Sequence, residues 1–517
     1  MKIIRGLIYA GLIATPVEYS RVRRALTFDD HDSYLRPDGT LYSGLIDFVR
    51  EQLGGHYPIE VEDTFKFDHP SSIKDIYIPD DFIPFEDPSH RLRAYQIKAA
   101  KKAIWKGRGI VEIATGGGKT EIFAVIAKYL LENGYAKQIF FIAETRFLMN
   151  QAAERFERRG LEGVRRFGGG NKFEPGQIQV CVVDSVRRAL ASLNGDVCEA
   201  FANCDVICLD ECHHMQAKSW VDIIEQCPAK YRYGLTATLW SDPFKYSYSD
   251  FRLIGLTGSP VACVPSAVLR RQGFLAEPYV TMLEVSYPPV HQRKWKDYYR
   301  TGIVEHRRRN SYIVSLARSL YEGLYKTLVF VNYIAHGLSL VKTLRNLGVE
   351  QVCFVKGGEM MYEWMPSGRW VRSRTSIELL AEKVRDEEQV VMIGNSVLDE
   401  GIDIPSFNAL IMGTAMKKYR RSLQRVGRGM RPKEGDNSVY IFDFIDGMQE
   451  KLMEHSLYRM KTYELEEYEF SSDLLDTCDR MGIPLLLEDG LYQWDASPEL
   501  GHEKGKKSRR KTRKAAL

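Results

Sequence analysis

Two short segments constrain the fold of this chain more than any other part of its sequence. The first, residues 109–120, reads GIVEIATGGGKT: an apolar run breaks into a glycine-rich turn that ends in Lys119 and Thr120. Glycine lets the backbone turn its N–H groups onto phosphate oxygens, and a following helix points its positive dipole end at the same place. The segment therefore predicts a buried strand, a phosphate-binding turn and a helix, the opening unit of a parallel α/β sheet.

The second segment, residues 206–213, reads VICLDECH and predicts another buried strand. It delivers Asp210 and Glu211 at its carboxyl end, the edge at which α/β sheets place their chemistry. We expect Asp210 to bind a metal ion and Glu211 to orient or deprotonate an attacking water. An acidic pair beside a glycine-rich turn with no nucleotide is the alternative interpretation, but the two segments in this order favour nucleotide hydrolysis.

The glycine-rich turn supplies the expected ligands of ATP and Mg²⁺. Lys119 is expected to hold the β- and γ-phosphates, and the Thr120 hydroxyl is expected to ligate Mg²⁺ together with Asp210. The strict phosphate-loop pattern begins with glycine, whereas this chain has Ile113 at that position. The other residues assigned to the turn are Thr115, Gly116, Gly117 and Gly118.

Length and composition indicate a globular protein with about three domains. The chain has 517 residues, of which 44% are apolar and 27% charged, and no apolar run approaches the roughly 18–20 residues that span a bilayer. The start, MKIIRGLIYAGLIATP, superficially resembles a signal peptide. A strand–turn–strand is the favoured interpretation, because a nucleotide hydrolase with free cysteines fits a reducing, ATP-containing compartment, the cytoplasm.

Nine cysteines are present, and three of them, Cys204, Cys208 and Cys212, recur every four residues beside two histidines. A zinc or iron–sulfur site is one interpretation of this spacing. Ordinary packing is favoured, because Cys208 lies inside the strand that leads to Asp210 and the chain has no Cys-x-x-Cys pair.

Charge is distributed unevenly along the chain. Residues 1–90 contain 9 Lys and Arg against 16 Asp and Glu, whereas the segment Lys504–Lys514 contains 8 basic residues and no acidic one. A basic run of this kind cannot bury apolar surface, so we expect a disordered cationic tail. Such a tail could hold a polyanion electrostatically or could simply be solvated.

Alternation of strands and helices predicts two parallel-sheet domains in tandem. The first set of strands is expected at Gly109–Ala114, Gln138–Ala143, Gln177–Val183, Val206–Leu209 and Tyr231–Thr236. The second set is expected at Lys326–Val331, Gln351–Val355, Gln389–Gly394, Ala409–Met412 and Ser438–Phe444. A linker is expected near Pro278–Gln292, where Pro288 and Pro289 occur together.

The second domain supplies a group of arginines. Residues 424–431 read QRVGRGMR, which puts Gln424, Arg428 and Arg431 at a helix-like spacing. Guanidinium groups brought across a cleft would stabilise the charge that develops on a γ-phosphoryl group. A surface arginine cluster is the alternative interpretation. Upstream, the segment DEGIDIP offers Gly401 for close backbone approach and Asp403 for contact with the ribose or the arginines.

Residues 91–450 resemble the superfamily 2 helicases and translocases. The likeness rests on short motifs in the family's order: RLRAYQ (91–96), the glycine-rich turn, AETRFLMNQ (143–151), VVDSV (182–186), DECH (210–213), GLTATL (234–239), VFVNYIAHG (329–337) and QRVGRGMR (424–431). It implies two RecA-like motor domains, residues 91–285 and 286–465. Residues 1–90 would form an N-terminal accessory domain, and residues 466–517 a C-terminal extension with the basic tail.

The resemblance also implies roles for residues outside the phosphate site. Arg93 and Gln96, with Tyr95 between them, look like the family's adenine-reading element. Thr236 and Thr238, with His213, look like the motifs that couple hydrolysis to movement. The residues implied in contacts with the nucleic-acid backbone are Thr145, Arg146, Ser185, Asn395 and Ser396.

A narrower likeness is to the phage UvsW-like helicases, carried by the segment from Tyr298 to Ala317 and by GGG (168–170), LTGSPV (256–261) and FDFIDG (442–447). It implies ATP-dependent unwinding and branch migration of DNA in recombination, repair or replication, with 3′→5′ polarity, in a host's cytoplasm if the chain is phage-encoded. The expected partner is branched or single-stranded DNA, held by its backbone without strong sequence specificity. The acidity of residues 1–90 argues against a DNA grip in that domain. A duplex-DNA translocase subunit of a restriction or defence complex and an RNA helicase are the alternatives.

One segment of the second domain predicts a hairpin, MMYEWMPSGRWVRSRT at residues 360–375. The turn signal Pro366-Ser367-Gly368 is flanked by Trp364 and Trp370 and followed by several arginines, of which Arg369 is the first. Aromatic and arginine side chains can stack on bases and hold phosphate, which would make the hairpin a wedge at a DNA junction. The favoured alternative is that both tryptophans pack against their own domain.

Overall fold

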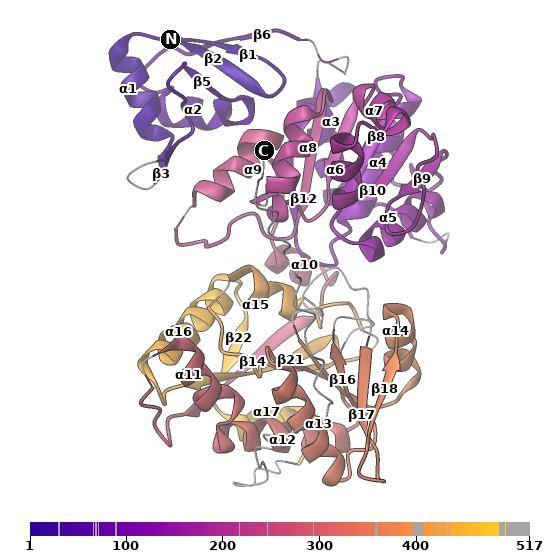
Figure 1. The fold of residues 1–517 in the computed structure, drawn as a ribbon, viewed down its shortest axis with the longest axis vertical. Helices are drawn as coiled ribbons and strands as arrows, with labels where there is room; N and C mark the ends of the chain where they lie inside the picture. Colours follow the sequence, from indigo (N-terminus) through magenta and orange to yellow (C-terminus); the bar gives the residue numbers. More distant parts are fainter. Residues whose placement is uncertain are drawn as a thin grey trace, which may run out of the picture.

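The computed structural model describes residues 1–28, 32–65, 67, 70, 72–87, 90–216, 218–245, 247–292, 294–356, 360–395, 407–417, 419–427, 429–433, 435–484 and 492. They form a small N-terminal domain and two larger lobes, each built on a sheet (Figure 1). Five residues or segments to which the sequence assigned a role lie outside the described residues: Ser396, Gly401, Asp403, Arg428 and the tail Lys504–Lys514.

Lobe 1 contains a seven-stranded sheet in which every pair of neighbours is parallel. In spatial order its strands are β13 (Pro260–Val264), β7 (Arg108–Ile113), β12 (Tyr231–Thr236), β11 (Val206–Leu209), β8 (Ile139–Ala143), β10 (Ile178–Val182) and β9 (Val164–Phe167). Its helices are α3 (Ala94–Lys106), α4 (Lys119–Glu132), α5 (Arg146–Arg158), α6 (Val183–Ala191), α7 (Gly195–Ala202), α8 (Lys218–Gln226), α9 (Tyr248–Thr257) and α10 (Ser266–Arg271). Strands β7, β11 and β8 are almost entirely buried, as expected of a sheet covered on both faces.

Lobe 2 contains a nine-stranded sheet, parallel except where strand β17 pairs with its two neighbours. In spatial order its strands are β18 (Trp370–Arg374), β17 (Met360–Trp364), β16 (Val352–Lys356), β19 (Val390–Gly394), β15 (Lys326–Phe330), β20 (Ala409–Ile411), β21 (Ser438–Asp446), β14 (Glu277–Val285) and β22 (Glu469–Ser471). Its helices are α11 (Trp295–Tyr299), a π-helical turn (Arg300–Val304), α12 (Arg307–Glu322), α13 (Ile334–Asn346), α14 (Ile377–Asp386), α15 (Tyr419–Val426), α16 (Glu450–Leu465) and α17 (Leu474–Met481).

The two parallel sheets confirm the α/β architecture expected from the sequence, and the hairpin β17–β18 confirms the turn expected near Gly368. The prediction of a linker at Pro278–Gln292 is wrong for the first half of that segment. Strand β14 starts at Glu277 and pairs with β21 along all nine of its residues, so it belongs to the sheet of lobe 2. The sequence pattern did not reveal this strand, because its short apolar alternation is followed by prolines. Since β14 pairs with β21, lobe 2 begins about one strand earlier than predicted.

The N-terminal domain contains a four-stranded sheet, two helices and a short antiparallel pair of strands, β3 (Thr27–Phe28) and β4 (Asp32–Ser33). Its strands, in spatial order, are β5 (Thr40–Tyr42), β2 (Tyr9–Ile13), β1 (Lys2–Arg5) and β6 (Glu60–Asp63), and its helices are α1 (Pro16–Ala25) and α2 (Ile46–Leu53). Strands β1 and β2 are antiparallel, which confirms the expected strand–turn–strand at the start of the chain. Thr15 caps α1 through a reciprocal bond with Glu18.

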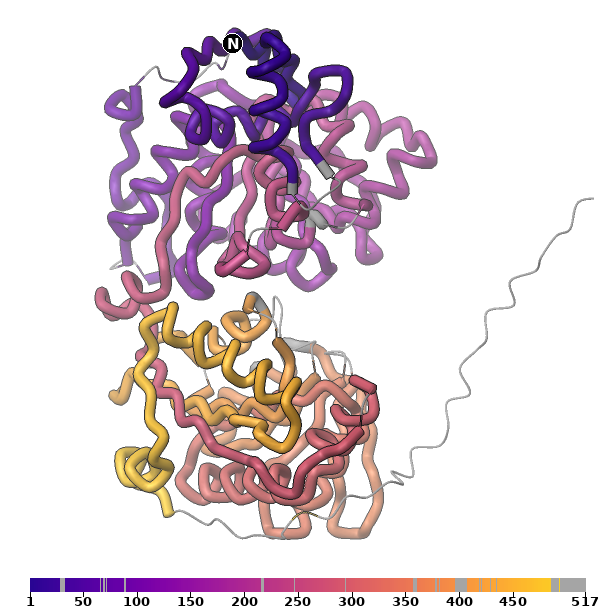
Figure 2. The backbone as a smooth tube through the Cα atoms, turned by 90° about the vertical axis from the view of Figure 1, so that its left-hand side faces the viewer, coloured from indigo at the N-terminus to yellow at the C-terminus, as the bar shows by residue number. Residues whose placement is uncertain are grey.

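The N-terminal domain is packed firmly on lobe 1, at the end that faces away from lobe 2 (Figure 2). Its core is continuous with that of lobe 1, and the rings of Tyr34 and Tyr248 stack with centroids 4.1 Å apart. The hydroxyls of Tyr9 and Tyr42 both donate to Glu225 on α8, at 2.6 and 2.7 Å. Among the described residues, no helix is long and apolar enough to cross a membrane.

Candidate nucleotide site between the lobes

The phosphate loop occupies the turn between β7 and α4. Gly116 and Gly118 have φ angles of 81° and 79°, a conformation that residues with a Cβ rarely adopt. Gly117 is needed for a different reason: a Cβ there would lie 2.5 Å from the Ile113 side chain. Helix α4 starts at Lys119, so its first N–H groups face the same space as the loop. Ile113 packs under the turn, which is why glycine is not required at that position.

The carboxylates that follow β11 lie against this loop. Lys119 Nζ is 3.5 Å from Glu211 Oε1, and the Glu211 N–H donates to Asp210 Oδ1 at 3.1 Å. Glu211 has a φ of 44°, a strained conformation for a residue with a side chain, and such strain concentrates at functional sites. Burial, followed by the neighbouring Glu211 charge, raises the pKa of Asp210 to about 7, while Lys119 acts in the opposite direction. A nearby divalent cation would relieve this unfavourable burial of charge.

His213 connects the carboxylates to both lobes. Its Nδ1 is 3.1 Å from the Thr236 hydroxyl and 3.4 Å from Glu211 Oε2. The Thr236 hydroxyl in turn bonds to the backbone of Thr238 in both directions. Across the cleft, Gln424 Nε2 is 3.3 Å from His213 Nε2. If the Gln424 amide donates this bond, His213 Nε2 is the acceptor and His213 Nδ1 carries the proton. The three residues that the sequence assigned to coupling, His213, Thr236 and Thr238, therefore lie in one network of contacts.

Lobe 2 closes the other side of a cleft of about 650 Å³. The cleft is lined by the phosphate loop, both carboxylates, Gln424 and Arg431. Burial and the facing Arg155 lower the pKa of Arg431, so an anion between them would be favoured. The prediction that Gln424 and the arginines that follow it share a helix is wrong in part. Helix α15 carries Gln424 but ends at Val426, and Arg431 lies beyond it.

The glycines that follow this helix allow two close approaches of the backbone. A Cβ on Gly429 would lie 2.3 Å from Val439 of β21, and one on Gly427 would lie 3.0 Å from Thr115 of the phosphate loop. The backbone of lobe 2 therefore approaches both its own sheet and the loop of lobe 1 at close range.

The residues expected to read adenine support the phosphate loop. Gln96 Oε1 accepts from the Arg93 N–H at 2.9 Å, and its Nε2 donates to the Gly117 carbonyl at 3.3 Å. The Tyr95 hydroxyl donates to the same carbonyl at 2.6 Å, and the Arg93 guanidinium lies 4.0 Å above the Phe274 ring. Arg93 and Gln96 still line the cleft, so they lie beside the nucleotide space. Both polar ends of the Gln96 amide already have partners within the protein.

Several residues of the cleft were missed from the sequence. Arg155 on α5 donates to Glu121 Oε1 at 2.8 Å, and Arg159 lies 3.5 Å from the same oxygen. The Arg159 guanidinium also lies 4.3 Å above the ring of Phe85, and all four side chains line the cleft. The spacing of Arg155 and Arg159 on one helix face was the available signal, but their acidic partner is on α4 and only the fold brings it near.

The residues of lobe 1 assigned to nucleic acid lie together at the carboxyl edge of its sheet. Thr145 caps α5, accepting from the Leu148 N–H at 3.2 Å, and is exposed together with Arg146. The turn at Gly168–Gly170 lies against both assigned side chains: a Cβ on Gly169 would be 2.5 Å from Arg146, and one on Gly168 would be 2.3 Å from Ser185. In lobe 2, Asn395 directly follows β19 and is partly exposed.

The tryptophans of the β17–β18 hairpin pack on each other and on their own lobe. Trp364 and Trp370 are paired across the strands with ring centroids 5.2 Å apart, and Lys342 of α13 lies 4.9 Å from the Trp364 ring. Both rings are partly buried against the core of lobe 2. Arg369, at the turn, and Arg374 are exposed.

The donor set of the cleft fits a nucleoside triphosphate with Mg²⁺. The glycine cradle is too tight for side chains, and a helix N-terminus and Lys119 face it. Burial raises the pKa of the Asp210 carboxyl, and the Lys119 charge lowers it. No cluster of three or more metal-ligating side chains occurs in the described part of the chain. Mg²⁺ held by one or two protein groups plus phosphates matches this arrangement. Asp210 and Thr120 are the residues that would hold it.

Comparison with known proteins agrees with this geometry. Residues 89–241 match the family described as type III restriction enzyme, res subunit, and residues 309–433 match the helicase conserved C-terminal domain. The chain belongs to the superfamily 2 helicases, which are ATP-dependent helicases and ATPases.

Individual relatives are distant. The chain is 23% identical over 403 residues to the ATP-dependent DNA helicase uvsW of Enterobacteria phage T4, which covers 73% of this chain and 76% of the relative. It is 25% identical over 366 residues to the DNA 3′-5′ translocase XPB2 of Sulfurisphaera tokodaii, covering 66% of this chain and 79% of the relative. Among solved structures, the DNA-bound type ISP restriction-modification enzyme LlaBIII has a TM-score of 0.52 at 14% identity and covers 82% of this chain and 34% of that one. This last likeness shows the fold alone.

Proposed function

We propose that this chain is an ATP-driven DNA helicase that acts on branched DNA intermediates of recombination, repair or replication. The proposal is carried by one observation: the hydrolytic carboxylates of lobe 1 are linked through His213 to Gln424 of lobe 2. A site shared by two lobes changes their relative position when its contents change, and that is the requirement for a motor. The likeness to the phage DNA helicase supports DNA as the substrate. Branched DNA as the preferred form is what the resemblance of the sequence motifs to the UvsW-like helicases implies.

The residues of the cleft divide the work of hydrolysis. Lys119 and the backbone of the phosphate loop bind the phosphates, and Glu211 orients the water or accepts its proton. Asp210 and Thr120 would hold Mg²⁺, which would supply positive charge beside the phosphates. Closure of the cleft brings Arg431, and in this proposal Arg428, onto the γ-phosphoryl group. Loss of that anion leaves Arg431 facing Arg155 again, which favours reopening.

Movement along DNA follows from alternating grips on its backbone. In lobe 1 the grip is assigned to the surface of Thr145, Arg146 and Ser185, and in lobe 2 to Asn395, Ser396 and the hairpin. Backbone contacts read no sequence, so the motor would act on DNA of any sequence. Polarity of 3′→5′ is part of the proposal and is supported by the named activity of the archaeal relative.

The test is a comparison of ATPase rate on four ligands: single-stranded DNA, plain duplex, a synthetic four-way junction and single-stranded RNA. Strong stimulation by the junction together with its branch migration supports the proposal. Stimulation by RNA with none by DNA would refute it. A strand-displacement assay on substrates with 3′ or 5′ tails measures the polarity independently.

A second candidate function is duplex translocation without strand separation, as part of a restriction or defence complex. It is favoured by the match of residues 89–241 to a restriction-enzyme family. Any nuclease or methyltransferase activity would then come from partner chains. A triplex-displacement assay distinguishes the two, since a pure translocase removes a third strand from duplex DNA but leaves a four-way junction unresolved.

The tryptophan wedge is a separate part of the proposal. Replacing Trp364 and Trp370 by alanine should lower base pairs unwound per ATP if the hairpin separates strands. Because both rings pack on lobe 2, the melting temperature of the variant must be measured alongside. Unwinding per ATP equal to wild type would remove the wedge and leave the motor proposal intact.

A further inference from the structure

Lobe 2 contains a buried arginine that no motif of the cleft includes. Arg309, near the start of α12, is 0% exposed, as is Asp446 at the end of β21. Arg309 Nε donates to Asp446 Oδ1 at 2.7 Å, and the guanidinium lies 4.3 Å above the Phe444 ring. Burying an ion pair is weak evidence of stabilisation, because desolvation offsets most of the attraction. The remaining partners of the guanidinium therefore indicate its role.

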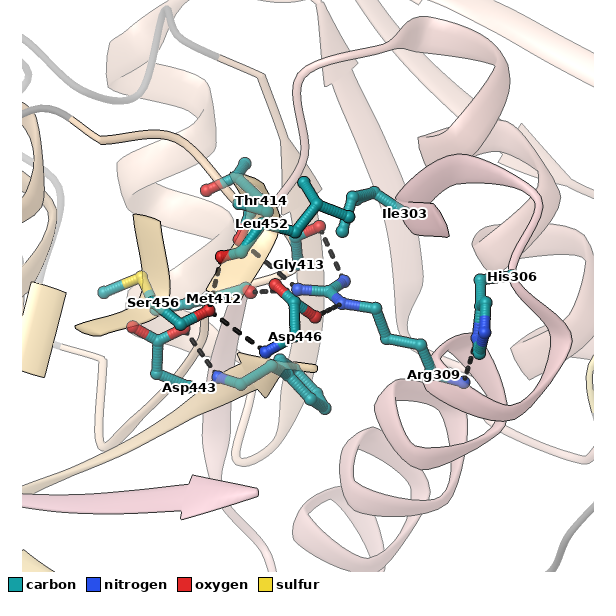
Figure 3. Close-up of polar contacts among 12 residues, drawn as sticks. Ile303, His306, Arg309, Met412, Gly413, Thr414, Asp443, Asp446, Leu452 and Ser456 are labelled. Carbon is teal, nitrogen blue, oxygen red and sulfur yellow. Dashed lines mark hydrogen bonds and ion pairs between the residues drawn. The ribbon is translucent and has the colours of Figure 1, made fainter. Parts of the chain in front are cut away.

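Those partners are three consecutive backbone carbonyls (Figure 3). Arg309 Nη1 donates to Gly413 O at 3.0 Å, and Nη2 donates to Met412 O and Thr414 O, each at 3.3 Å. These residues follow β20, whose pairing with β15 and β21 ends at Ile411. The planar guanidinium holds the three peptide groups in one geometry, which a lysine ammonium could not do.

The turn fixed by Arg309 leads directly into the helix that reaches the nucleotide cleft. Thr414 is 2% exposed, and its hydroxyl accepts from Arg425 Nη1 at 2.5 Å. Arg425 lies on α15, beside Gln424, whose amide contacts His213 across the cleft. A continuous chain of contacts therefore runs from Arg309 through the turn to the interlobe contact.

We propose that Arg309 is a positioning residue for ATP hydrolysis, acting through the turn at Met412–Thr414 to hold α15 and its side chains at the γ-phosphate end of the cleft. It touches neither nucleotide nor DNA. The proposal rests on the ATPase assignment above. Nucleotide binding is carried by the phosphate loop of lobe 1, so loss of this support should affect turnover and leave binding unchanged.

A matched control lies in the same buried region. Arg459 of α16 is 3% exposed and donates to Asp443 at 2.8 and 3.0 Å and to Phe444 O at 2.9 Å. It ties α16 to β21, and its Nη2 also lies 3.9 Å from Asp446 Oδ2. Among the described residues, no hydrogen bond joins it to the carbonyls of Met412–Thr414. Because Arg459 bonds to β21 and not to the carbonyls after β20, Arg459→Lys should lower stability about as much as Arg309→Lys and leave the bonds that hold that turn in place.

The experiment measures melting temperature, ATPase kcat and KM at saturating nucleic acid, and Kd for a fluorescent ATP analogue. For Arg309→Lys we expect kcat to fall roughly 10–100-fold with KM and Kd within about twofold of wild type, since misplacement by about 1 Å can cost 10²-fold. Arg459→Lys should keep kcat. Thr414→Val, which removes only the acceptor of Arg425, should lower kcat roughly 3–10-fold.

Each outcome decides the proposal. Equal kcat in Arg309→Lys and Arg459→Lys, at similar melting temperatures, would show that Arg309 is only structural. A rise in Kd that parallels the fall in kcat would show the same. If Arg309→Lys does not fold, Thr414→Val decides alone, and wild-type kcat in that variant overturns the proposal. An inactive wild type would refute the ATPase function as well, whereas an active wild type with an unaffected variant refutes the positioning role only.

Discussion

Lobe 1 and lobe 2 bring their groups to the same cleft by different means. In lobe 1 the cradle is made of backbone at a strand–helix junction, where Gly117 and Gly118 have no room for a Cβ. In lobe 2 the contacting residues follow a turn that depends on buried side chains, Arg309 among them. The phosphate-loop half of the cleft is therefore built from neighbouring residues, whereas the half in lobe 2 is held by residues that are distant in sequence.

The largest effect is expected from the water-orienting carboxylate of lobe 1. Glu211→Gln should lower kcat by about 10²–10⁴-fold, the usual contribution of a positioned base, while ATP binding remains. Steady-state ATPase with equilibrium binding of a fluorescent analogue measures both. Glu157→Gln, at a surface ion pair with Arg166, is the control and should keep kcat. Near-normal hydrolysis in Glu211→Gln would remove the carboxylate from the proposed chemistry.

The next effect tests whether the lobes communicate through His213. Gln424→Ala removes the contact across the cleft, and we expect nucleic-acid-stimulated kcat to fall roughly 3–10-fold, in line with one hydrogen bond. His213→Ala should have a similar or larger effect, because His213 also contacts Thr236. In the double variant, the fold decrease in kcat should then be smaller than the product of the fold decreases in the two single variants. Fully multiplicative losses would mean that the two residues act independently.

A smaller effect concerns the buried charge of lobe 1. Since the pKa of Asp210 is raised to about 7, protonation of this carboxyl favours the folded state, and wild-type stability falls as pH rises through that value. Asp210→Asn does not titrate there. Without Mg²⁺ and nucleotide, its melting temperature should exceed that of wild type at pH 8, and the difference should shrink as pH falls below about 7. Asp184→Asn, at an exposed position of α6, should show no such trend. A pH-independent difference for Asp210→Asn would contradict the assignment.

The smallest effect is expected from the exposed arginines of the hairpin in lobe 2. Arg369→Ala with Arg374→Ala should reduce the salt dependence of DNA binding by about two phosphate contacts, and kcat at saturating DNA should stay near wild type. Titrations at several salt concentrations measure the slope. Arg318→Ala with Lys417→Ala removes two other surface cations that are paired with glutamates, and is the control. An unchanged slope would exclude the hairpin from the DNA interface.

Much of lobe 1 could be predicted from local sequence because its signals are contiguous. Strands β11 and β12 have the expected bounds, and both carboxylates end up beside Lys119. Strands β9 and β13 were missed because VRRF and PVACV are short and lack a clear apolar pattern. The packing of the N-terminal domain on lobe 1 was also missed, since the three tyrosines that make it are far from their partners in sequence.

Local sequence patterns specify the class of the protein: a glycine-rich turn, a carboxylate pair and an arginine group occur in the order typical of a superfamily 2 motor. These features are readable because each needs only a few neighbouring residues to specify its backbone. The folded structure was needed to show that β14 belongs to lobe 2, where α15 ends and what holds the turn after β20. Those outcomes depend on long-range contacts, such as the one between Arg309 and the carbonyls about 100 residues later, that local pattern does not encode.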